Sequence, residues 1–338
     1  MGSCLLVAQL FTMNAEAQDP HFSQFFEAPL LRNPSLAGMF PGDIRVQAVY
    51  RNQWGSVSVP YKTVSFNTEY KQPVGSEDDF LTLGLQILYD RAGEASLTTT
   101  NILPAIAYHK CINPERGSFI SAGFMGGYVQ RRIDRSKITT NSQYDLNGYN
   151  PALPDGETFL NSNYSYWDGA VGVNYNSAFG EGAENNYFMG IAYHHFNRPK
   201  NSFYKKPDVE LNGKIVFSAG VSATINDFSY FTVQGDYTIQ GPAKEAVLGT
   251  LYSYKAGNYS DDPDYTLSFG GFVRLKDAFI PVVKLDYKPF CIGLSYDANI
   301  SELKTATQSK GGFELSITYA GFLDRNSSPL KGVRSFRF

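Results

Sequence analysis

Residues 213–240 read GKIVFSAGVSATINDFSYFTVQGDYTIQ, and this stretch decides the fold class. In its first half every second position from Ile215 to Ile225 is apolar, and the positions between them are mostly small or polar. The second half repeats the pattern from Phe231 to Ile239. A period of two residues is typical of a β-strand with two unlike faces, whereas a helix has a period near 3.6. The stretch therefore predicts two neighbouring strands, each with one face toward hydrocarbon and the other toward water.

The same alternation recurs along the 338 residues in about fourteen spans long enough to cross a membrane at a tilt. We therefore predict an all-β fold, a transmembrane antiparallel up-and-down β-barrel of about 14 strands. A soluble sandwich could show the same alternation, but the long strands, the export signal and the terminal Phe338 favour a membrane. The predicted strands are 43–53, 59–70, 81–90, 98–110, 117–131, 164–176, 187–196, 213–225, 229–240, 246–255, 266–275, 279–287, 290–298 and 312–320.

Composition agrees with a membrane barrel. The mean hydropathy of -0.26 resembles that of a soluble protein, but a barrel averages to such a value because half of every strand and all loops are polar. No uncharged apolar run approaches the roughly 20 residues of a membrane-spanning helix. The net charge of -3, without clustered basic residues, gives no reason to expect a nucleic-acid partner.

We expect four parts in the chain. Residues 1–17 resemble a signal peptide that ends in Ala15-Glu16-Ala17, with an incomplete n-region that lacks Lys and Arg. Residues 18–42 form a Pro-rich N-terminal segment, and we separate it from the barrel because its prolines exclude a regular strand or helix. This segment is either periplasmic or lumenal. Residues 43–320 form the outer membrane β-barrel, and residues 321–338 form a C-terminal tail that ends in Phe.

An even number of strands predicts that both termini lie on the periplasmic side. Alternate connections should then be short, as at Asn226-Asp227 and Lys288-Pro289, and the outward connections long, as at 132–163, 197–212 and 299–311. Tyrosines near predicted strand ends would form an aromatic girdle at the headgroups, for example Tyr70, Tyr89, Tyr175, Tyr187, Tyr287 and Tyr319.

Ordered blocks along the chain resemble the PorP/SprF family of outer membrane proteins, which is associated with the type IX secretion system of Bacteroidetes. The resemblance covers nearly the whole mature chain. The blocks are QDPHFSQFFEAPLLRNPSLAG (18–38), YRNQWGSVSVPYKTVSFNTEY (50–70), LGLQILYDRAG (83–93), HHFNRPKNSF (194–203), FGGFVRLKDAFIPVVKLDYKPFCIGLSYDANISEL (269–303) and KGGFELSITY (310–319).

The resemblance implies a non-enzymatic accessory barrel, integral to the outer membrane and in contact with its lipid. Its partners would be the C-terminal signal domain of a secreted adhesin, as in gliding machinery, and the periplasmic ring or lipoprotein components of the secretion system. Such a protein would support export or surface attachment of the adhesin. The alternative is a passive, porin-like outer membrane diffusion channel.

Partner-binding residues are sought outside the strand pattern, where loops held on a rigid barrel carry function. Phe22, Phe25 and Phe26 in the Pro-rich segment are candidate anchors. Candidate outward contacts are Arg51, Asn52, Gln53 and Trp54, with Asp90, Arg91 and Gly93. In structural terms, Trp54 could instead anchor at the membrane interface, Gly93 could supply a positive φ, and Asp90 with Arg91 could cap a turn.

The faces assigned to the lumen carry small side chains mixed with charged ones. A barrel of about fourteen strands is wide enough to hold water, so the lumen could be a channel. The small residues could instead make room for the N-terminal segment as a plug, and the sequence leaves both open. These positions are Gly84, Gly172, Ser218, Gly220, Ser222, Gly293, Ser295 and Ser316, with Lys214, Asp236, Asp297 and Glu314.

No catalytic, cofactor-binding or metal-binding set is predicted. HExxH, GxSxG, P-loop and dinucleotide-binding motifs are absent from the sequence. We expect the rings of His194 and His195 to face opposite ways at a strand end, which argues against a joint ligand set. No motif in the sequence supports a catalytic dyad of either histidine with Asp168. Asp261, Asp262 and Asp264 lack the spacing of a calcium loop, and Cys111 and Cys291 are expected to be unpaired thiols.

Overall fold

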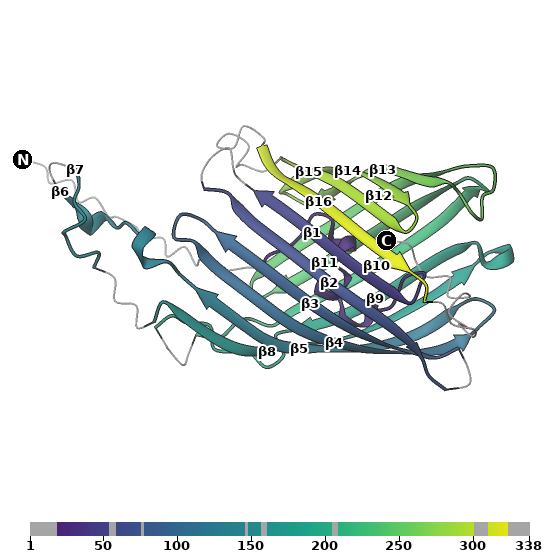
Figure 1. Cartoon of the computed structure of the whole chain (residues 1–338), viewed down its shortest axis with the longest axis horizontal. Coiled ribbons are helices and arrows are strands. Elements are labelled where there is room, and N and C mark those ends of the chain that lie inside the picture. Colours follow the sequence, from purple (N-terminus) through teal and green to yellow (C-terminus); the bar gives the residue numbers. More distant parts are fainter. Residues whose placement is uncertain are drawn as a thin grey trace, which may run out of the picture.

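A computed structural model describes residues 19–53, 59–75, 78–145, 148–156, 161–204, 209–300 and 310–323. Fourteen antiparallel strands close into one barrel, in which β1 (Ile44–Gln53) pairs with β16 (Lys310–Gly321). All other barrel strands pair with their neighbours along the chain (Figure 1). The remaining strands are β2 (Tyr61–Pro73), β3 (Phe80–Ala92), β4 (Leu97–Asn113), β5 (Ser118–Arg132), β8 (Asn163–Phe179), β9 (Asn185–His194), β10 (Lys214–Asn226), β11 (Ser229–Gln240), β12 (Ala243–Ala256), β13 (Tyr265–Arg274), β14 (Ala278–Tyr287) and β15 (Phe290–Asn299).

The predicted fold class is confirmed, and each predicted strand corresponds to one observed barrel strand. The connection between β5 and β8 adds a feature that the sequence did not predict, a small sheet of β6 (Tyr144–Asp145) and β7 (Gly148–Tyr149). Strands of two residues are too short to show an alternation. Short 3-10 helices lie in the same connection, namely η3 (Arg135–Lys137) and η4 (Asn141–Gln143), and a further one, η5 (Glu181–Ala183), joins β8 to β9.

Alternation along the strands separates two surfaces. In β10, Phe217 and Val221 are exposed on the outer face, whereas Val216 and Ser218 are buried on the inner face. Burial here is burial in the lumen, so polar residues dominate the inner faces of many strands. An apolar outer surface around a polar interior is the arrangement that hydrocarbon requires. Within the described part of the chain, no helix is long and apolar enough to cross a membrane.

The two ends of the barrel differ, and we name them by their contents. The loop end holds the long connections from β5 to β8 and from β9 to β10, and the arm with β6 and β7 extends from it (Figure 1). The β1 end is where β1 begins and β16 ends, and its connections include Asp227-Phe228 and Lys288-Pro289. Asp43 joins the strands at this end, because its backbone N–H donates to Gly321 O at 2.8 Å.

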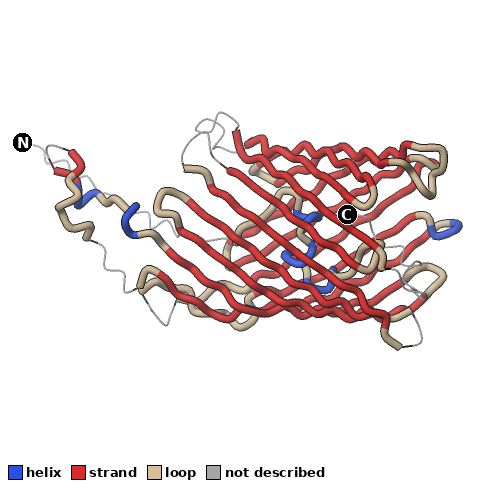
Figure 2. The backbone as a smooth tube through the Cα atoms, in the orientation of Figure 1, coloured by secondary structure: helices blue, strands red, loops and turns tan. Residues whose placement is uncertain are grey.

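Residues 19–43 lie inside the barrel, and we call this segment the plug. Figure 2 shows its helices within the ring of strands, namely η1 (Phe25–Glu27), α1 (Pro29–Arg32) and η2 (Pro34–Leu36). The plug runs through the lumen from Asp43 at the β1 end to Asp19, which contacts residues of the loop end. The described chain therefore starts and ends at opposite ends of the barrel. The termini themselves, whose common periplasmic side was predicted, lie outside the described residues.

Candidate functional site

The lumen holds the densest set of interactions in the described protein, and aromatic side chains of the plug anchor it. Phe26 has no exposed surface and packs in a cluster with Phe272 and Ile280 of the barrel wall. Its ring centroid lies 5.3 Å from that of Phe272. Phe22 packs in a second cluster with Val49 of β1 and Leu88 of β3. Burying a phenylalanine side chain contributes about 1.5–3 kcal/mol, so these anchors stabilise the plug inside the barrel.

Glycines of the strands provide the space that the plug occupies. A Cβ atom at Gly123 would collide with the backbone of Pro34 and Ser35, and one at Gly172 would collide with the Asn33 side chain. At Gly293 a Cβ would lie 2.5 Å from Gln24 Oε1. Small inner-face residues therefore accommodate the plug, the second of the two interpretations that the sequence left open.

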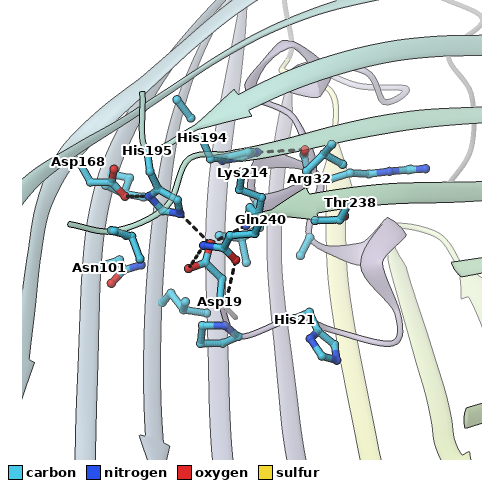
Figure 3. Close-up of a pocket in the computed structure, with 18 of the residues that line it drawn as sticks. Asp19, His21, Arg32, Asn101, Asp168, His194, His195, Lys214, Thr238 and Gln240 are labelled. Carbon is cyan, nitrogen blue, oxygen red and sulfur yellow. Dashed lines mark hydrogen bonds and ion pairs between the residues drawn. The ribbon is translucent and has the colours of Figure 1, made fainter. Parts of the chain in front are cut away.

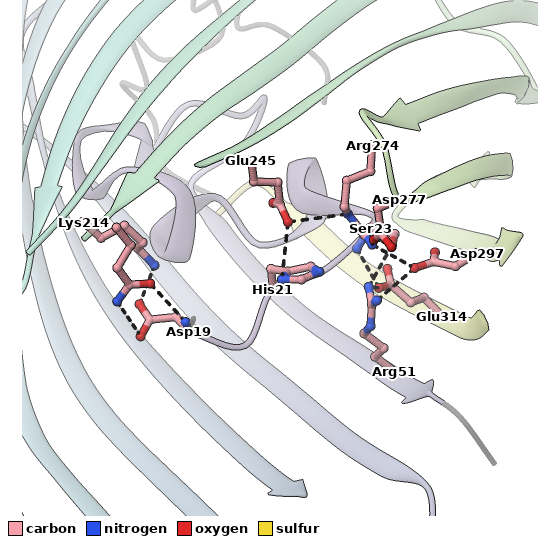
Figure 4. Close-up of polar contacts among 11 residues, drawn as sticks. Asp19, His21, Ser23, Arg51, Lys214, Glu245, Arg274, Asp277, Asp297 and Glu314 are labelled. Carbon is pink, nitrogen blue, oxygen red and sulfur yellow. Dashed lines mark hydrogen bonds and ion pairs between the residues drawn. The ribbon is translucent and has the colours of Figure 1, made fainter. Parts of the chain in front are cut away.

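A buried charge network holds the start of η1. Glu314 accepts the backbone N–H groups of Ser23 at 2.6 Å and Gln24 at 2.8 Å. Arg51 Nη1 lies 2.5 Å from Glu314, and its Nη2 donates to Asp297 at 2.9 Å. Arg274 Nη2 donates to the Ser23 hydroxyl at 2.6 Å (Figure 4). Strands β1, β13, β15 and β16 thus converge on one turn of the plug.

Two further ion pairs cross from the plug to the wall. Arg32 Nε donates to Asp236 at 2.7 Å, and Glu27 Oε1 lies 2.5 Å from Lys284 Nζ. Both pairs are buried, and removing one partner of a buried pair typically costs about 3–5 kcal/mol. Neutral contacts supplement them, because Asn33 Nδ2 donates to the backbone carbonyl of Val173 at 3.2 Å.

At the loop end a polar cluster holds Asp19, and we call it the latch. His195 Nδ1 lies 2.7 Å from Asp168 Oδ2, and His195 Nε2 lies 2.7 Å from Asp19 Oδ2. Lys214 Nζ donates to the same Asp19 oxygen at 2.7 Å, and Gln240 Nε2 donates to Asp19 Oδ1 at 3.2 Å (Figure 3).

The latch alters the ionisation of its members. Burial alone would lower the pKa of His195, but the carboxylates of Asp19 and Asp168 outweigh it and raise the pKa to about 9. Burial would raise the pKa of Asp19, but Lys214 and His195 hold that pKa well below its usual range. A protonated His195 thus joins two carboxylates near neutral pH.

The expected opposite orientation of His194 and His195 is wrong. Both side chains line the same cavity, because β9 ends at His194 and His195 has a φ of 56°. This left-handed conformation breaks the alternation. Both ring nitrogens of His195 contact carboxylates, so the Asp168–His195 contact holds the plug and leaves neither nitrogen for a substrate.

Two hollows flank the plug. A cavity of about 180 Å³ lies at the loop end between the plug and the wall formed by β3, β4, β5 and β8 to β12, and we call it the loop-end cavity. A hollow of about 750 Å³ lies at the β1 end, beneath Met39 and Phe40 of the plug, and we call it the vestibule. Its remaining walls come mainly from β11 to β16.

The predicted partner-binding residues occupy three kinds of position. Phe22 and Phe26 are buried in the lumen, and Phe25 is half-buried, with its ring 5.5 Å from that of Phe272. The three rings therefore anchor the plug, and binding of a partner by them stays a prediction.

The outward placement of Arg51 is corrected by the structure. Its side chain is 1% exposed, because Arg51 shares the lumenal face of β1 with Arg45 and Gln47. There it pairs with the carboxylates of Asp297 and Glu314 in the buried charge network. Asn52 and Gln53 are half-buried at the loop end of β1, and Trp54 lies outside the described residues.

The second predicted group lies at the loop end of β3. Asp90 accepts a hydrogen bond from the Thr63 hydroxyl at 2.7 Å, and Arg91 Nη2 donates to Ser96 at 3.0 Å. Gly93 has a φ of 63° in the following turn, which a residue with a side chain adopts less readily. These contacts are structural, and their use by a partner stays a prediction.

Sequence reasoning did not assign the residues that hold the plug, chiefly Asp19, Ser23, Gln24, Asn33 and Glu314. Charged residues on the inner faces of the strands could have indicated part of this set of contacts. Charged residues at inner-face positions, such as Asp297 and Glu314, need partners inside a barrel, and the Pro-rich segment carries Glu27 and Arg32. Complementary charges in the two parts of the sequence favour their contact.

The acidic turn and the two cysteines considered as metal or redox sites lie in surroundings that need no ligand. Asp262 lies 2.6 Å from Lys288 Nζ at the surface, and this contact lowers its pKa. Cys111 and Cys291 are free thiols. Among the described residues, no group of three or more His, Cys, Asp or Glu side chains is placed to hold a metal ion.

Comparison with protein families assigns the chain. A family model described as type IX secretion system membrane protein PorP/SprF matches residues 14–319. The chain belongs to the PorP/SprF family. The matched range includes the buried charge network, the latch and the glycines that make room for the plug. This PorP/SprF protein is therefore an outer membrane barrel whose lumen is occupied by its own N-terminal segment.

Solved structures similar to this PorP/SprF chain have low sequence identity. The toluene transporter TbuX of Ralstonia pickettii is 11% identical, with a TM-score of 0.49, over 87% of this chain and 92% of that one. The monoaromatic hydrocarbon channel CymD is 9% identical, with a TM-score of 0.49, over 88% and 94%. The translocator domain of the autotransporter NalP from Neisseria meningitidis is 12% identical, with a TM-score of 0.38, over 82% and 88%. No curated protein matches the chain by sequence.

Proposed function

We propose that this protein is a non-enzymatic accessory barrel of the type IX secretion system that binds partners at its two ends. It holds the C-terminal signal domain of a secreted adhesin, periplasmic ring or lipoprotein components, or both, and so supports export or surface attachment. The observation that carries this proposal is the occupied lumen of a chain in the PorP/SprF family. A plug held by buried ion pairs favours binding over passage of solutes.

The two ends suit different partners. An even number of strands puts the start of β1 and the end of β16 on one side of the membrane, and short turns typically face the periplasm. We assign the β1 end to the periplasm, where the vestibule of about 750 Å³ would receive a segment of a ring component. We assign the loop end, with Asn52, Gln53 and the turn 90–93, to contact with the adhesin domain.

Affinity purification of the tagged protein from native outer membranes, with mass spectrometry of the co-purified proteins, tests this proposal. Charge reversal at each end gives matched variants, since Arg91→Glu changes the loop end and Lys288→Glu changes the β1 end. We expect Arg91→Glu to lose a large secreted protein and keep periplasmic components, and Lys288→Glu to do the reverse. Recovery of the barrel alone, from a preparation that keeps other membrane complexes intact, would instead support the diffusion channel.

A further inference from the structure

The loop-end cavity has an apolar wall and a polar wall. Phe22 and Leu31 of the plug face the cavity together with Leu88, Leu103 and Met125 of the barrel. Its volume of about 180 Å³ slightly exceeds the roughly 150 Å³ of an engineered cavity that holds benzene. The cavity therefore has room for one six-membered ring with a small substituent.

Arg131 is the cation of this cavity that has no carboxylate within ion-pair distance, and it interacts with Asp90 over a longer range. Among the described residues, none of the carboxylates lies within 4.0 Å of its guanidinium, and its Nε, although buried, has no hydrogen-bond partner. The other cations of the lining have carboxylate partners, because Arg32 pairs with Asp236 and both His195 and Lys214 contact Asp19. An unmatched buried donor of this kind favours an anion.

Hydrogen bonds hold the guanidinium of Arg131 in place and leave its Nε atom without a partner. Arg131 Nη1 donates to Asn201 Oδ1 at 2.8 Å, and Asn201 also accepts the hydroxyl of Tyr164. The Tyr164 hydroxyl also interacts with the Arg131 side chain. These contacts hold the planar group in place, and the unpartnered Nε lies on the edge through which a guanidinium binds a carboxylate.

Polar neighbours on the wall extend the site. Thr99 lies directly opposite Arg131 in the pairing of β4 with β5, and Asn101 is the next inner-face residue of β4. Both line the cavity, as Figure 3 shows for Asn101. A hydroxyl and an amide beside a guanidinium supply further donors to an oxyanion.

We propose that the loop-end cavity binds a small monocarboxylate with an apolar body, such as an aromatic acid or the C-terminal carboxylate of a peptide that ends in an apolar residue. Arg131 binds the carboxylate, and the wall of Phe22, Leu31, Leu103 and Met125 covers the apolar body. Because the plug forms part of this wall, a bound acid stabilises the plug in the lumen. The site does not depend on the partners proposed above.

Benzoate binding to the purified full-length barrel, measured by calorimetry and by ligand-observed NMR, tests the site. Benzamide has the same shape without the charge. A charge-assisted bidentate contact should make benzoate bind at least about tenfold more tightly than benzamide to the unmodified protein. Arg131→Gln should remove this preference, and Leu103→Trp should block both ligands by filling the cavity.

The neighbouring Arg132→Gln is the matched control, because Arg132 is exposed on the other face of β5, and it should keep the preference. Equal binding of benzoate and benzamide, an unchanged preference in Arg131→Gln, or no saturable benzoate binding overturns the proposal. A short peptide that ends in Phe, with a free or an amidated C-terminus, distinguishes the sources. If the peptide with the free C-terminus competes with benzoate and the amidated peptide does not, the natural ligand is a peptide terminus. If neither peptide competes, the natural ligand is a small carboxylic acid.

Discussion

At the scale of single residues, the plug depends on a few buried polar contacts. Glu314 joins the plug backbone to Arg51, and both carboxylate oxygens are used. Such a group is costly to alter because its partners stay buried in the lumen. The inner-face position of Glu314 was predicted from the strand alternation. Its contact with Ser23 and Gln24 could not be, because alternation gives a face and carries no information about a partner 290 residues away.

Glu314→Gln should lower the free energy of unfolding by about 1.5–3 kcal/mol, because the variant weakens the charge-assisted hydrogen bonds of Glu314 while Asp297 still pairs with Arg51. Urea titration of the barrel in detergent measures this loss. Glu210→Gln is the matched control, since Glu210 pairs with Lys200 at the surface, and it should change stability by less than about 1 kcal/mol. Equal effects of the two variants would contradict the role of Glu314.

The latch predicts a pH dependence. Because the pKa of His195 is raised to about 9, its stabilisation is complete below the unfolded pKa of about 6.5 and is lost as the pH rises through about 9. The shift in the pKa of His195 corresponds to at most about 3–4 kcal/mol. Asp19, with a lowered pKa, stabilises the latch above about pH 3.8 and loses this effect in stronger acid.

The free energy of unfolding of His195→Gln, compared with that of the unmodified protein from pH 6 to pH 10, tests this dependence. We expect the unmodified protein to be more stable at pH 6 and the difference to shrink toward pH 10. A difference that stays constant over this range would show that the charge of His195 does not hold the latch.

At the scale of elements, the strands and the plug differ in how far the sequence predicts them. Each barrel strand buries one face and exposes the other to lipid, so its period is visible in the sequence. The plug lacks a period, because η1, α1 and η2 are each three or four residues long and contact the wall on several sides. We expected its prolines to exclude a helix, but Pro29 and Pro34 stand at the first residues of α1 and η2, where proline is tolerated. Only the fold shows that Gly123 and Gly172 make room for the plug.

Gly123→Val should displace η2, because the added side chain would meet the backbone of Pro34 and Ser35. Overpacking of this kind typically costs about 1–3 kcal/mol, and an unseated plug should let ions pass. Bilayer recordings should therefore show conductance for Gly123→Val. Ala122→Val is the matched control, because Ala122 is exposed on the outer face of the same strand, and it should stay silent. A Gly123→Val variant without conductance would show that Gly123 is not needed to hold the plug in place.

At the scale of the whole molecule, closure of the sheet and filling of its lumen together shape the two ends of the protein. Fourteen strands enclose a space that would otherwise hold water. The plug divides this space into the loop-end cavity and the vestibule, so each end presents its own recess. The sequence predicted the strand number and the family but left the lumen open to two interpretations. The choice between them depends on contacts between distant parts of the chain.

The measurement that tests the central claim most directly is the ion conductance of the unmodified protein in planar bilayers, beside a variant that lacks residues 18–40. The plug should keep the unmodified barrel silent, and its removal should give a steady conductance, because the lumen of a fourteen-stranded barrel then fills with water. A steady open conductance of the unmodified protein, equal to that of the deletion variant, would contradict the account and identify a diffusion channel.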